Sequence, residues 1–513
     1  MSPPRRLWVS SFVVLLGLGV TWALATPPLA HPDEPAHAVK AASVVRGQLV
    51  PPKVDLPDEG PEALLRGAFT TLVDVPAAYT FQTSEIPECY VWDSHVPAGC
   101  APAWRADDTP AEWTAYIGRY PPGYYAAVGW PTLVDTGVGG FYAMRFLTAA
   151  LNAALLATAI AMGATMRRFR LLPAGVVAAT TPEVLILSGS VNPNSVEVAA
   201  AVCVWATLCV ALVWDGERLP LNLVVALTVA GALLASARPL SSMWLAAIAT
   251  GAVAAFGRRE VVVRRLRERA ARIGAAVVFA ASAAGATWTA LSDALGNNRG
   301  YNPWGLGPVD AAAHSVALTW SYLEQSVAAF GWIRTPGPAP LTVAWGVVVA
   351  ALAVPAFRAA DGRRRGALAG VAVLWLAMPT LLQAPTARSF GFVWSGRYGL
   401  ALFAGVPILA AVILGTSERA RPGRGVVAGA LGLAALVQTA AHAAGMRRYV
   451  AGTDGPVNYL GQRGWRPPVD PAVLLTLTAG LALALALIAF RAAAGGPIPA
   501  PAPGPAVGQS TSA

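Results

Sequence analysis

The chain has 513 residues, of which 55% are hydrophobic and only 12% are charged, and its mean hydropathy is +0.53. Soluble globular domains carry about twice that share of charge, so the composition excludes them and predicts an all-α polytopic membrane protein. The net charge of +10 and the pI near 9.8 do not indicate nucleic-acid binding. The arginines concentrate instead in short loops between apolar segments, as membrane topology requires.

Apolar stretches that are long enough to cross a bilayer recur along the chain, and we expect about twelve transmembrane helices. They lie at about 7–29, 140–166, 171–189, 195–214, 219–237, 240–257, 273–292, 341–357, 366–384, 397–416, 425–444 and 471–492. The first follows Arg5 and Arg6 and has some character of a signal peptide. It is too long for an ordinary one, so we predict an uncleaved anchor within a single transmembrane domain, 1–492.

Four basic loops orient the predicted spans, because positive residues favour the cytoplasmic side. These loops lie at 167–170, 258–272, 358–365 and 419–424. The sequence therefore predicts a multi-pass protein of the plasma membrane with both termini in the cytoplasm. Three sizeable loops then lie outside, at about 31–138, 293–340 and 445–470. A tail rich in Pro, Ala and Gly, at 493–513, is expected to be disordered in the cytoplasm.

The segment 121–135 is about fifteen residues long, which is short for a span. Counting it as one would place 167–170 outside and invert every later loop, so we interpret it as surface-lying or re-entrant. The sequence has no Gly-rich phosphate loop and no cytoplasmic domain to house ATP-dependent work. Any chemistry is therefore expected at the outer face.

Cysteine positions agree with an oxidising outer compartment. Cys89 and Cys100 flank a ten-residue stretch of the first outer loop, and this spacing predicts a disulfide. Free thiols are the alternative, and a metal site with His95 is another, although the spacing matches no zinc pattern. Cys203 and Cys209 fall inside a span and are expected to be small packing residues.

The segment 31–37, His-Pro-Asp-Glu-Pro-Ala-His, places two carboxylates and two imidazoles where the first span ends. Apolar residues at helical spacing follow it and predict a short amphipathic helix at the membrane interface, ended by Gly47. Asp33 or Glu34 capping that helix is the structural alternative. Two carboxylates with His37 one turn away favour a general base, or ligands for a divalent cation such as Mg or Mn.

Polar residues also mark the predicted turn between the third and fourth spans. Asn194 and Glu197 have the spacing of a capping box, and Asn-Pro makes the turn. The functional interpretation is that Asn192, Asn194 and Glu197 present polar groups to an outer cavity. Glu183 lies about 12 residues into its span, where a carboxylate is a functional candidate, and the adjacent Pro182 indicates a kink.

Three arginines, Arg238, Arg388 and Arg397, lie at predicted outer helix ends, where positive residues are normally depleted. Fixed guanidiniums there suit a lipid phosphate or pyrophosphate, and interfacial snorkelling is the alternative. Aromatic residues such as Trp332 and Tyr398 accompany them in the outer loops. Aromatic belts occur in many membrane proteins, but aromatics near acidic residues also suit sugar rings.

Several short motifs occur in a fixed order over roughly residues 10 to 445. They are Pro-Asp-Glu-Pro-Ala-His, Arg-Gly, Tyr-Pro-Pro-Gly-Tyr-Tyr, Val-Asn-Pro-Asn-Ser-Val-Glu, Ala-Arg-Pro-Leu, Phe-Gly-Trp-Ile and Gly-Arg-Tyr. Together they resemble the bacterial family known as domain of unknown function 2142. That family resembles the GT-C membrane glycosyltransferases, which take a sugar from a polyprenyl-phosphate carrier at the outer face with an acidic residue of the first outer loop.

The resemblance implies roles for particular residues of this chain. Asp33 and Glu34 match the acidic position, and Arg397 matches a contact to the donor phosphate. The chain departs from the pattern at Arg334, where an acidic residue is usual, and at Glu183, where an apolar residue is usual. The high Ala, Gly and Arg content is typical of a high-GC actinobacterium, for which arabinose or mannose carriers are expected donors.

The resulting hypothesis is an inverting GT-C-like glycosyltransferase that transfers a sugar to a cell-wall glycan or lipid acceptor. Asp33 or Glu34 would deprotonate the acceptor hydroxyl, and Arg397, with Arg388 or a divalent cation, would meet the phosphate charge. The expected substrate-binding residues are His37, Asn192, Asn194, Glu197, Arg238, Arg388, Arg397, Tyr398 and Trp332. The alternatives are a lipid-linked sugar flippase or transporter, for which the spans hold few polar residues, and a non-catalytic envelope assembly protein.

Overall fold

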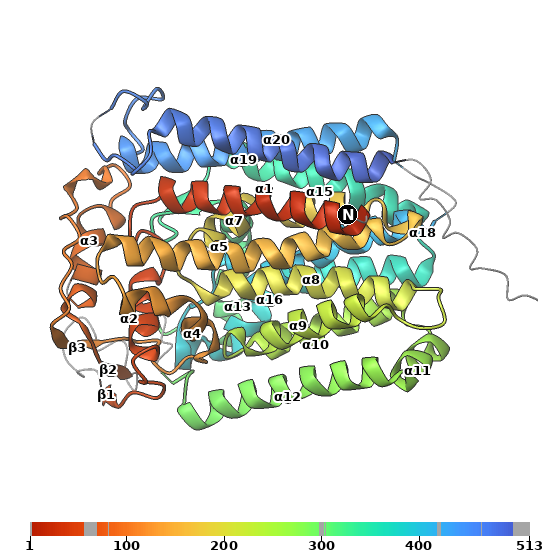
Figure 1. The fold of residues 1–513 in the computed structure, drawn as a ribbon, viewed down its shortest axis with the longest axis horizontal. Helices are drawn as coiled ribbons and strands as arrows, with labels where there is room; N and C mark the ends of the chain where they lie inside the picture. Colours follow the sequence, from red (N-terminus) through yellow and green to blue (C-terminus); the bar gives the residue numbers. More distant parts are fainter. Residues whose placement is uncertain are drawn as a thin grey trace, which may run out of the picture.

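A computed structural model of the chain describes residues 3–55, 69–80, 82–296, 302, 304–417, 422–462 and 464–495. Most of these residues are helical, and the long helices run along one axis of the molecule (Figure 1). The start of α1 and the end of α20 lie toward one end of this axis, the right-hand end in Figure 1. The short elements α2, α3, α4 and β1–β3 cover the opposite end, which we call the capped end.

In the described part of the chain, nine helices are long and apolar enough to cross a membrane, or ten if one bent pair counts as a span. The unbroken ones are α1 (Pro3–Ala25), α5 (Val138–Ala161), α8 (Pro193–Val213), α12 (Arg269–Ser292), α15 (Ala339–Ala359), α16 (Gly362–Phe390), α19 (Arg424–Val450) and α20 (Pro471–Ala494). A ninth is assembled from η7 (Gly396–Gly399), α17 (Leu400–Phe403) and α18 (Gly405–Thr416).

The predicted count of twelve spans is not confirmed. The stretches 219–237 and 240–257 form the helices α9 (Leu221–Ala237) and α10 (Ser241–Phe256), which have 17 and 16 residues. The stretch 171–189 is not one helix but two, α6 (Leu172–Ala179) and α7 (Pro182–Ser188), bent by 72°.

The kink at Pro182 is confirmed, and neighbouring side chains satisfy the carbonyl groups that it frees. Gln438 Nε2 donates to the Thr180 carbonyl at 2.8 Å, and Trp345 Nε1 donates to the Ala178 carbonyl at 3.1 Å. Thr181 Oγ1 in turn donates to the Ser326 carbonyl at 2.8 Å. A broken helix is tolerated at membrane depth because such contacts replace the lost backbone bonds.

The remaining elements are short and join or cover the long helices. The helices are α2 (Glu34–Val44), α3 (Gln82–Val91), α4 (Gly123–Gly129), α11 (Arg259–Arg267), α13 (Pro308–Ala317) and α14 (Thr319–Val327). The 3₁₀ turns are η2 (Ala77–Tyr79), η3 (Ala98–Cys100), η4 (Trp130–Leu133), η5 (Met162–Ala164) and η6 (Arg167–Phe169).

The all-α prediction needs a correction, because the loops that were predicted to lie outside contain two small antiparallel sheets. The first has the order β1 (Lys53–Asp55), β2 (Phe69–Pro76) and β3 (Pro110–Thr114), with Val73 opposite Trp113. The second is a hairpin of β4 (Ala329–Phe330) and β5 (Thr335–Pro336).

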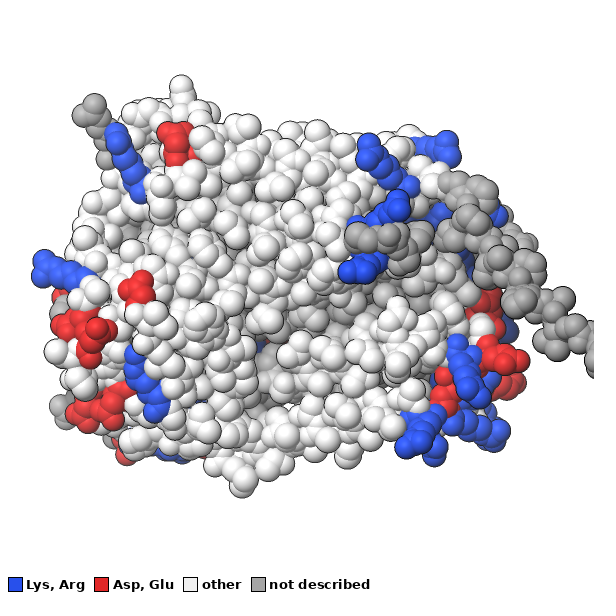
Figure 2. Space-filling view, viewed as in Figure 1, with Lys and Arg blue, Asp and Glu red and all other residues white. Residues whose placement is uncertain are grey.

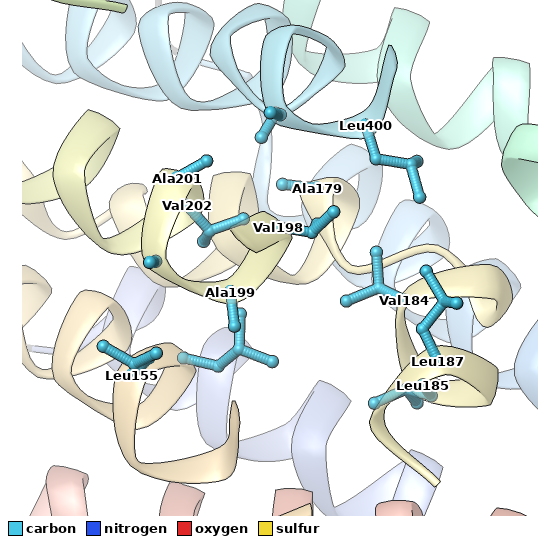
Figure 3. Close-up of a cluster of buried hydrophobic side chains, with 14 of the residues drawn as sticks. Leu155, Ala179, Val184, Leu185, Leu187, Val198, Ala199, Ala201, Val202 and Leu400 are labelled. Atoms are coloured by element: carbon cyan, nitrogen blue, oxygen red, sulfur yellow. The ribbon is translucent and has the colours of Figure 1, made fainter. Parts of the chain in front are cut away.

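The packing centre of the bundle is α8, with the 396–416 span beside it, and 89% of each apolar window is buried. Figure 3 shows α5, α6, α7, α8 and α17 meeting there through small and branched side chains such as Leu155, Val184 and Val202. Trp205 of α8 is fully buried and donates from Nε1 to the Ala401 carbonyl at 2.9 Å. Small residues let these backbones approach closely, which is how helices associate in membranes.

Charge is distributed along the axis as a bilayer-crossing protein requires. Figure 2 shows a broad band of uncharged surface between two charged ends on this face of the molecule. Lys and Arg gather at the end that holds the start of α1 and α11, with Asp and Glu among them, and acidic and basic residues also mix at the capped end. The ends of α20 and α19 also meet basic loops, since Arg170 Nη1 donates to the Gly495 carbonyl and Arg424 Nη2 to the Ala494 carbonyl.

Two predicted segments, the interfacial helix and the C-terminal tail, differ from their expected form. The interfacial amphipathic helix is α2, whose eleven residues are all buried beneath neighbouring elements of the capped end, so it is not a surface helix. The segment 121–135 forms α4 and η4, both of which pack on α2. The predicted tail begins late, because α20 continues to Ala494, and its remainder from residue 496 lies outside the described residues.

Candidate functional site

The turn from α1 into α2 presents Asp33 and Glu34 to different neighbours. Asp33 has φ 63°, in the left-handed region that non-glycine residues seldom occupy. It occupies the N-cap position of α2, but its side chain makes no capping hydrogen bond. The capping alternative is therefore wrong for Asp33, and the two carboxylates have other partners.

Glu34 is a structural residue. It forms a fully buried bidentate ion pair with Arg145 of α5, in which Oε1 accepts from Nε at 2.9 Å and Oε2 from Nη2 at 2.6 Å. Oε1 also accepts the Val191 N–H at 2.9 Å. Its side chain is fully buried, so an acceptor hydroxyl has no access to the Glu34 carboxylate in this conformation.

Arg145 extends this link to the end of α1. Its Nη1 donates to the carbonyls of Ala23 and Thr26, and its Nη2 donates to that of Pro27, each at 2.8 Å. Arg145 was not among the residues predicted from the sequence, although a charge inside an apolar stretch is a recognisable signal. Together, Glu34 and Arg145 fix the turn that carries Asp33.

Asp33 is ionised and accessible, and its side chain is 34% exposed. Its Oδ2 accepts a hydrogen bond from Arg397 Nη2, and its Oδ1 accepts one from the Tyr116 hydroxyl at 2.6 Å. Burial raises the pKa of Asp33, but the charge of Arg397 and the bond from Tyr116 outweigh it and hold the pKa below its usual range. Of the two predicted acids, only Asp33 has the access that a base requires.

The Arg397 side chain is only 3% exposed, yet two of its N–H donor groups are not used in hydrogen bonds among the described residues. Its Nη2 contacts Asp33 and the Tyr398 hydroxyl, whereas Nε and Nη1 have no hydrogen-bond partner among the described residues. The adjacent Ser395 hydroxyl is likewise buried and unpartnered in the described part of the chain. Unpartnered buried donors are costly, so this edge of Arg397 is suited to an anionic ligand.

Arg238 also lies against the ring of Tyr398. Its guanidinium carbon is 4.7 Å from the Tyr398 ring centroid, and that of Arg397 is 5.1 Å away. Arg238 Nη1 donates to Glu197 Oε2 at 3.0 Å, and Ser241 Oγ donates to Glu197 Oε1 at 2.5 Å. Glu197 therefore neutralises Arg238 and fixes it beside the aromatic ring.

The turn before α8 holds Glu197 in place for its ion pair with Arg238, but the residue that caps α8 differs from the prediction. Asn194 donates from Nδ2 to Glu197 Oε2 at 2.8 Å, but it is not the cap of α8. Asn192 is the cap, because its Oδ1 accepts the Asn194 N–H at 2.9 Å. Asn192 Nδ2 also donates to the Pro32 carbonyl at 3.2 Å, which joins this turn to the segment that carries Asp33.

His37 faces tyrosines from the segment 116–125. A 2.8 Å hydrogen bond joins its Nδ1 and the Tyr125 hydroxyl, and the Tyr120 ring lies 6.4 Å from the imidazole. Burial lowers the pKa of His37 to about 3, the charges of Arg238 and Arg397 add to this, and Asp33 opposes it. The imidazole is therefore neutral at physiological pH.

Two predicted site residues and Glu183 make no hydrogen bond to Asp33 or Arg397 within the described ranges. Arg388 is exposed near the end of α16, beside Gly307, with no hydrogen bond to Asp33 or Arg397 in the described chain. Trp332 is half-buried and donates from Nε1 to the Leu29 carbonyl at 3.3 Å. Glu183 begins α7 and accepts the Ala329 N–H at 2.9 Å.

A divalent cation shared by Asp33 and Glu34 does not fit this geometry. The Glu34 oxygens face Arg145, and the Asp33 oxygens face Arg397 and Tyr116. Within the described ranges, no group of three or more His, Cys, Asp or Glu side chains could hold a metal ion. His95 is likewise engaged with Thr453 and Asp454, and Cys89 and Cys100 form a disulfide, so that pair does not join His95 in a metal site.

A small cavity lies next to Arg397 along the chain. It is lined by aromatic and small residues of α14, α16 and η7, including Tyr322, Ser326, Trp375, Trp394, Gly396 and Gly399. Leu376 also lines it and is 44% exposed on a candidate span, so the cavity borders the apolar outer surface. Trp375 and Trp394 were not predicted, since nothing in their local sequence distinguishes them from core residues.

A known protein family includes this chain. The model of a family described as predicted membrane protein (DUF2142) matches residues 16–406, more than half of the chain. The chain belongs to the DUF2142 family. The match includes Asp33, Glu197, Arg238 and Arg397, so the site lies within the family region of this DUF2142 protein. No curated protein matches it.

Proposed function

We propose that this DUF2142 protein is a GT-C-like inverting glycosyltransferase of the plasma membrane, with the capped end outside the cell. Its donor would be a polyprenyl-phosphate sugar, and its acceptor a hydroxyl of an envelope glycan or lipid. The basic loops at the opposite end support this orientation, because positive residues favour the cytoplasm. The helices α9 and α10 pack with α8 in the bundle, which supports counting them, with the bent pair, toward twelve spans.

One observation carries the proposal: a buried arginine with two unpartnered donors sits against an accessible carboxylate. Arg397 Nε and Nη1 lack partners among the described residues, while Nη2 contacts Asp33. A phosphate offers several oxygens in the geometry that a guanidinium recognises. Asp33 would thus serve as the base, and Arg397, in direct contact with it, would bind the anion.

The cavity beside Arg397 supports a lipid-linked donor over a soluble one. Its lining is mainly apolar and aromatic, and Leu376 connects it with the lipid-facing surface of α16. A phosphate at Arg397 would leave the first isoprenoid units next to Trp375 and Trp394. A water-soluble nucleotide sugar would have no need of such a lining.

In the proposed mechanism, Asp33 takes the proton of the acceptor hydroxyl as its oxygen bonds to the anomeric carbon. The bond from that carbon to the phosphate oxygen breaks, and polyprenyl phosphate leaves with its charge beside Arg397. A single displacement of this kind inverts the anomeric centre. Binding of the donor phosphate to Arg397 would also weaken the contact of Arg397 with Asp33, which makes the carboxylate a stronger base.

The test compares Asp33→Asn with the wild type for sugar transfer from labelled polyprenyl-phosphate donors in membranes. Loss of a general base lowers the rate by about 10²–10⁴-fold, and Arg397→Lys should also lower it, because lysine lacks the planar donor edge. The matched control is Asp107→Asn, an exposed aspartate of the same outer loop. Full activity in Asp33→Asn contradicts the proposal, and donor translocation without a glycosidic product would indicate a flippase instead.

A further inference from the structure

Two tryptophans from separate outer loops lie edge to face near the turn that carries Asp33. Trp92 follows α3, and Trp332 lies in the turn between β4 and β5, with ring centroids 5.2 Å apart at 75°. Trp92 is 53% exposed and Trp332 is half-buried. The exposed Arg334 places its guanidinium carbon 5.3 Å from the Trp92 ring centroid. We call Trp92, Trp332 and Arg334 the aromatic platform.

The backbone beneath the platform holds an unusual conformation. Gly331, Trp332 and Ile333 have φ values of 55°, 54° and 69° in succession, although bulky and β-branched residues rarely adopt this left-handed region. The Gly331 N–H donates to the Tyr449 hydroxyl at 3.0 Å, and Trp332 Nε1 donates to the carbonyl of Leu29, which is itself left-handed. Conformations of this kind persist where the surroundings enforce them, commonly at ligand sites.

Arg448, at the end of α19, donates hydrogen bonds to both loops of the platform. From its buried position, Nη1 donates to the Val96 carbonyl at 2.8 Å, and Nη2 to the Tyr90 and Asp93 carbonyls at 2.5 and 3.0 Å. Its Nε donates to Thr335 Oγ1 at 3.2 Å, in the strand that follows Trp332 and Arg334. The Cys89–Cys100 disulfide closes the loop that carries Trp92. The two rings are therefore presented by fixed backbone.

Polar groups in the Trp92 loop indicate contact with water rather than lipid. His95 Nδ1 lies 2.9 Å from Asp454 Oδ2, with both side chains exposed, and the hydroxyls of Ser94 and Thr453 are 3.3 Å apart. Aromatic rings that anchor a protein in a bilayer lie in its headgroup belt, against an apolar band. An exposed tryptophan with a polar rim and an adjacent guanidinium has the chemistry of a ligand surface.

We propose that the aromatic platform binds a saccharide chain. The apolar C–H faces of sugar rings stack on aromatic side chains, while a guanidinium donates to hydroxyl or acid oxygens. Binding at this surface does not depend on the proposed transferase activity. The additional assignment, that the platform holds the acceptor glycan, rests on that proposed function.

Saccharide binding can be measured on the full chain in lipid nanodiscs, with mannohexaose and arabinohexaose as soluble probes. Trp92→Ala and Trp332→Gly should each weaken binding about tenfold, the loss expected from one aromatic contact. Glycine is chosen at position 332 because it accepts the left-handed backbone. Trp130→Ala is the matched control, since Trp130 is 51% exposed in η4, away from the platform, and should leave binding unchanged.

Three results would overturn the platform. One is that neither probe binds to correctly folded protein at millimolar concentration, and another is binding that Trp92→Ala does not weaken. The third is quenching by brominated lipid of the part of the tryptophan fluorescence that Trp92→Ala removes, which would show that the surface meets the membrane. The two proposals can fail separately. If Trp92→Ala loses saccharide binding but the wild type transfers no sugar, the platform still binds saccharide and the proposed transferase function is rejected.

Discussion

Neighbouring carboxylates of this protein have opposite roles, and their partners decide which is which. Glu34 and Arg145 are both fully buried and satisfy one another, whereas Asp33 keeps access to solvent beside Arg397. The attraction within a buried ion pair contributes little more to stability than the desolvation of its two charges costs. Replacing one partner, however, lowers the stability strongly, because the other charge remains buried without a counter-ion. We therefore expect the Glu34 pair to govern stability, whereas the Asp33 pair is the one that the proposed sugar transfer would use.

Glu34→Gln should destabilise the fold by about 3–5 kcal/mol, because it leaves the Arg145 charge buried without a counter-ion. Thermal unfolding in detergent measures this change. The control is Asp293→Asn, which breaks an ion pair with Lys53 whose side chains are both more than a third exposed, and should cost about 0–1 kcal/mol. Equal effects of the two substitutions would contradict the structural role of Glu34.

His37 makes stability depend on pH in a defined direction. Its pKa in the folded protein is about 3, so between pH 6.5 and 3 the unfolded chain binds a proton that the folded chain does not. Stability should fall as the pH drops through this window, by about 1.4 kcal/mol per pH unit for this group. His37→Gln should reduce the slope of melting temperature against pH below 6.5. An unchanged slope would mean that the buried imidazole accepts its proton in the folded state.

The sequence could identify these residues but not their partners. Asp33 and Arg397 were expected at the site, since charged groups at a membrane boundary are seldom idle. Asp33 and Arg397 are in contact but lie 364 residues apart in the sequence, and Glu34 and Arg145 lie 111 residues apart. No local sequence pattern predicts contacts over such separations. Capping by Asp33 was a reasonable alternative that failed because its carboxylate turns to Arg397 and Tyr116 instead.

At the scale of elements, the approach of η7 to α14 fixes where Arg397 can lie. The Gly396 N–H donates to Gln325 Oε1 at 2.9 Å, and Ser326 Oγ donates to the Gly396 carbonyl at 3.0 Å. A methyl group on Gly396 would stand 2.1 Å from the Tyr322 carbonyl oxygen. Glycine at this position is therefore a condition for the site.

Gly396→Ala should push η7 away from α14 and lower transferase activity and melting temperature together. Overpacking of this kind typically costs about 1–3 kcal/mol. The control is Gly346→Ala in α15, where a methyl group meets nothing within 4 Å and should stabilise the helix by about 0.5–1 kcal/mol. A Gly396→Ala protein with wild-type stability and activity would show that α14 can move without harm.

The spans were predictable as elements because each is a long apolar run, and the break at Pro182 followed from proline's missing donor. The β1–β2–β3 sheet was not predictable. Its first strand has only three residues, and the strands β2 and β3 are separated by a loop that contains α3. The burial of α2 was missed because its apolar spacing describes an amphipathic helix equally well on a membrane surface or beneath other elements.

At the scale of the whole molecule, the uncharged band separates two chemically different ends (Figure 2). The proposed orientation predicts that Asp107→Cys in intact cells reacts with a membrane-impermeant maleimide, whereas Glu260→Cys in α11 reacts only after permeabilisation. The native cysteines do not interfere, since Cys203 and Cys209 are buried and Cys89 is bonded to Cys100. The reverse labelling pattern would invert the topology and reject an outward-facing site.

The contact of Arg145 with the end of α1 has a consequence for biosynthesis. Glu34 leaves the ribosome 111 residues before the guanidinium that neutralises it, and α1 cannot complete its carbonyl contacts until α5 has entered the membrane. During that interval Glu34 and the carbonyl groups at the end of α1 lack their Arg145 partner. Nascent chains truncated before residue 145 should therefore remain recognisable to quality-control proteases, and those truncated after α5 should escape them.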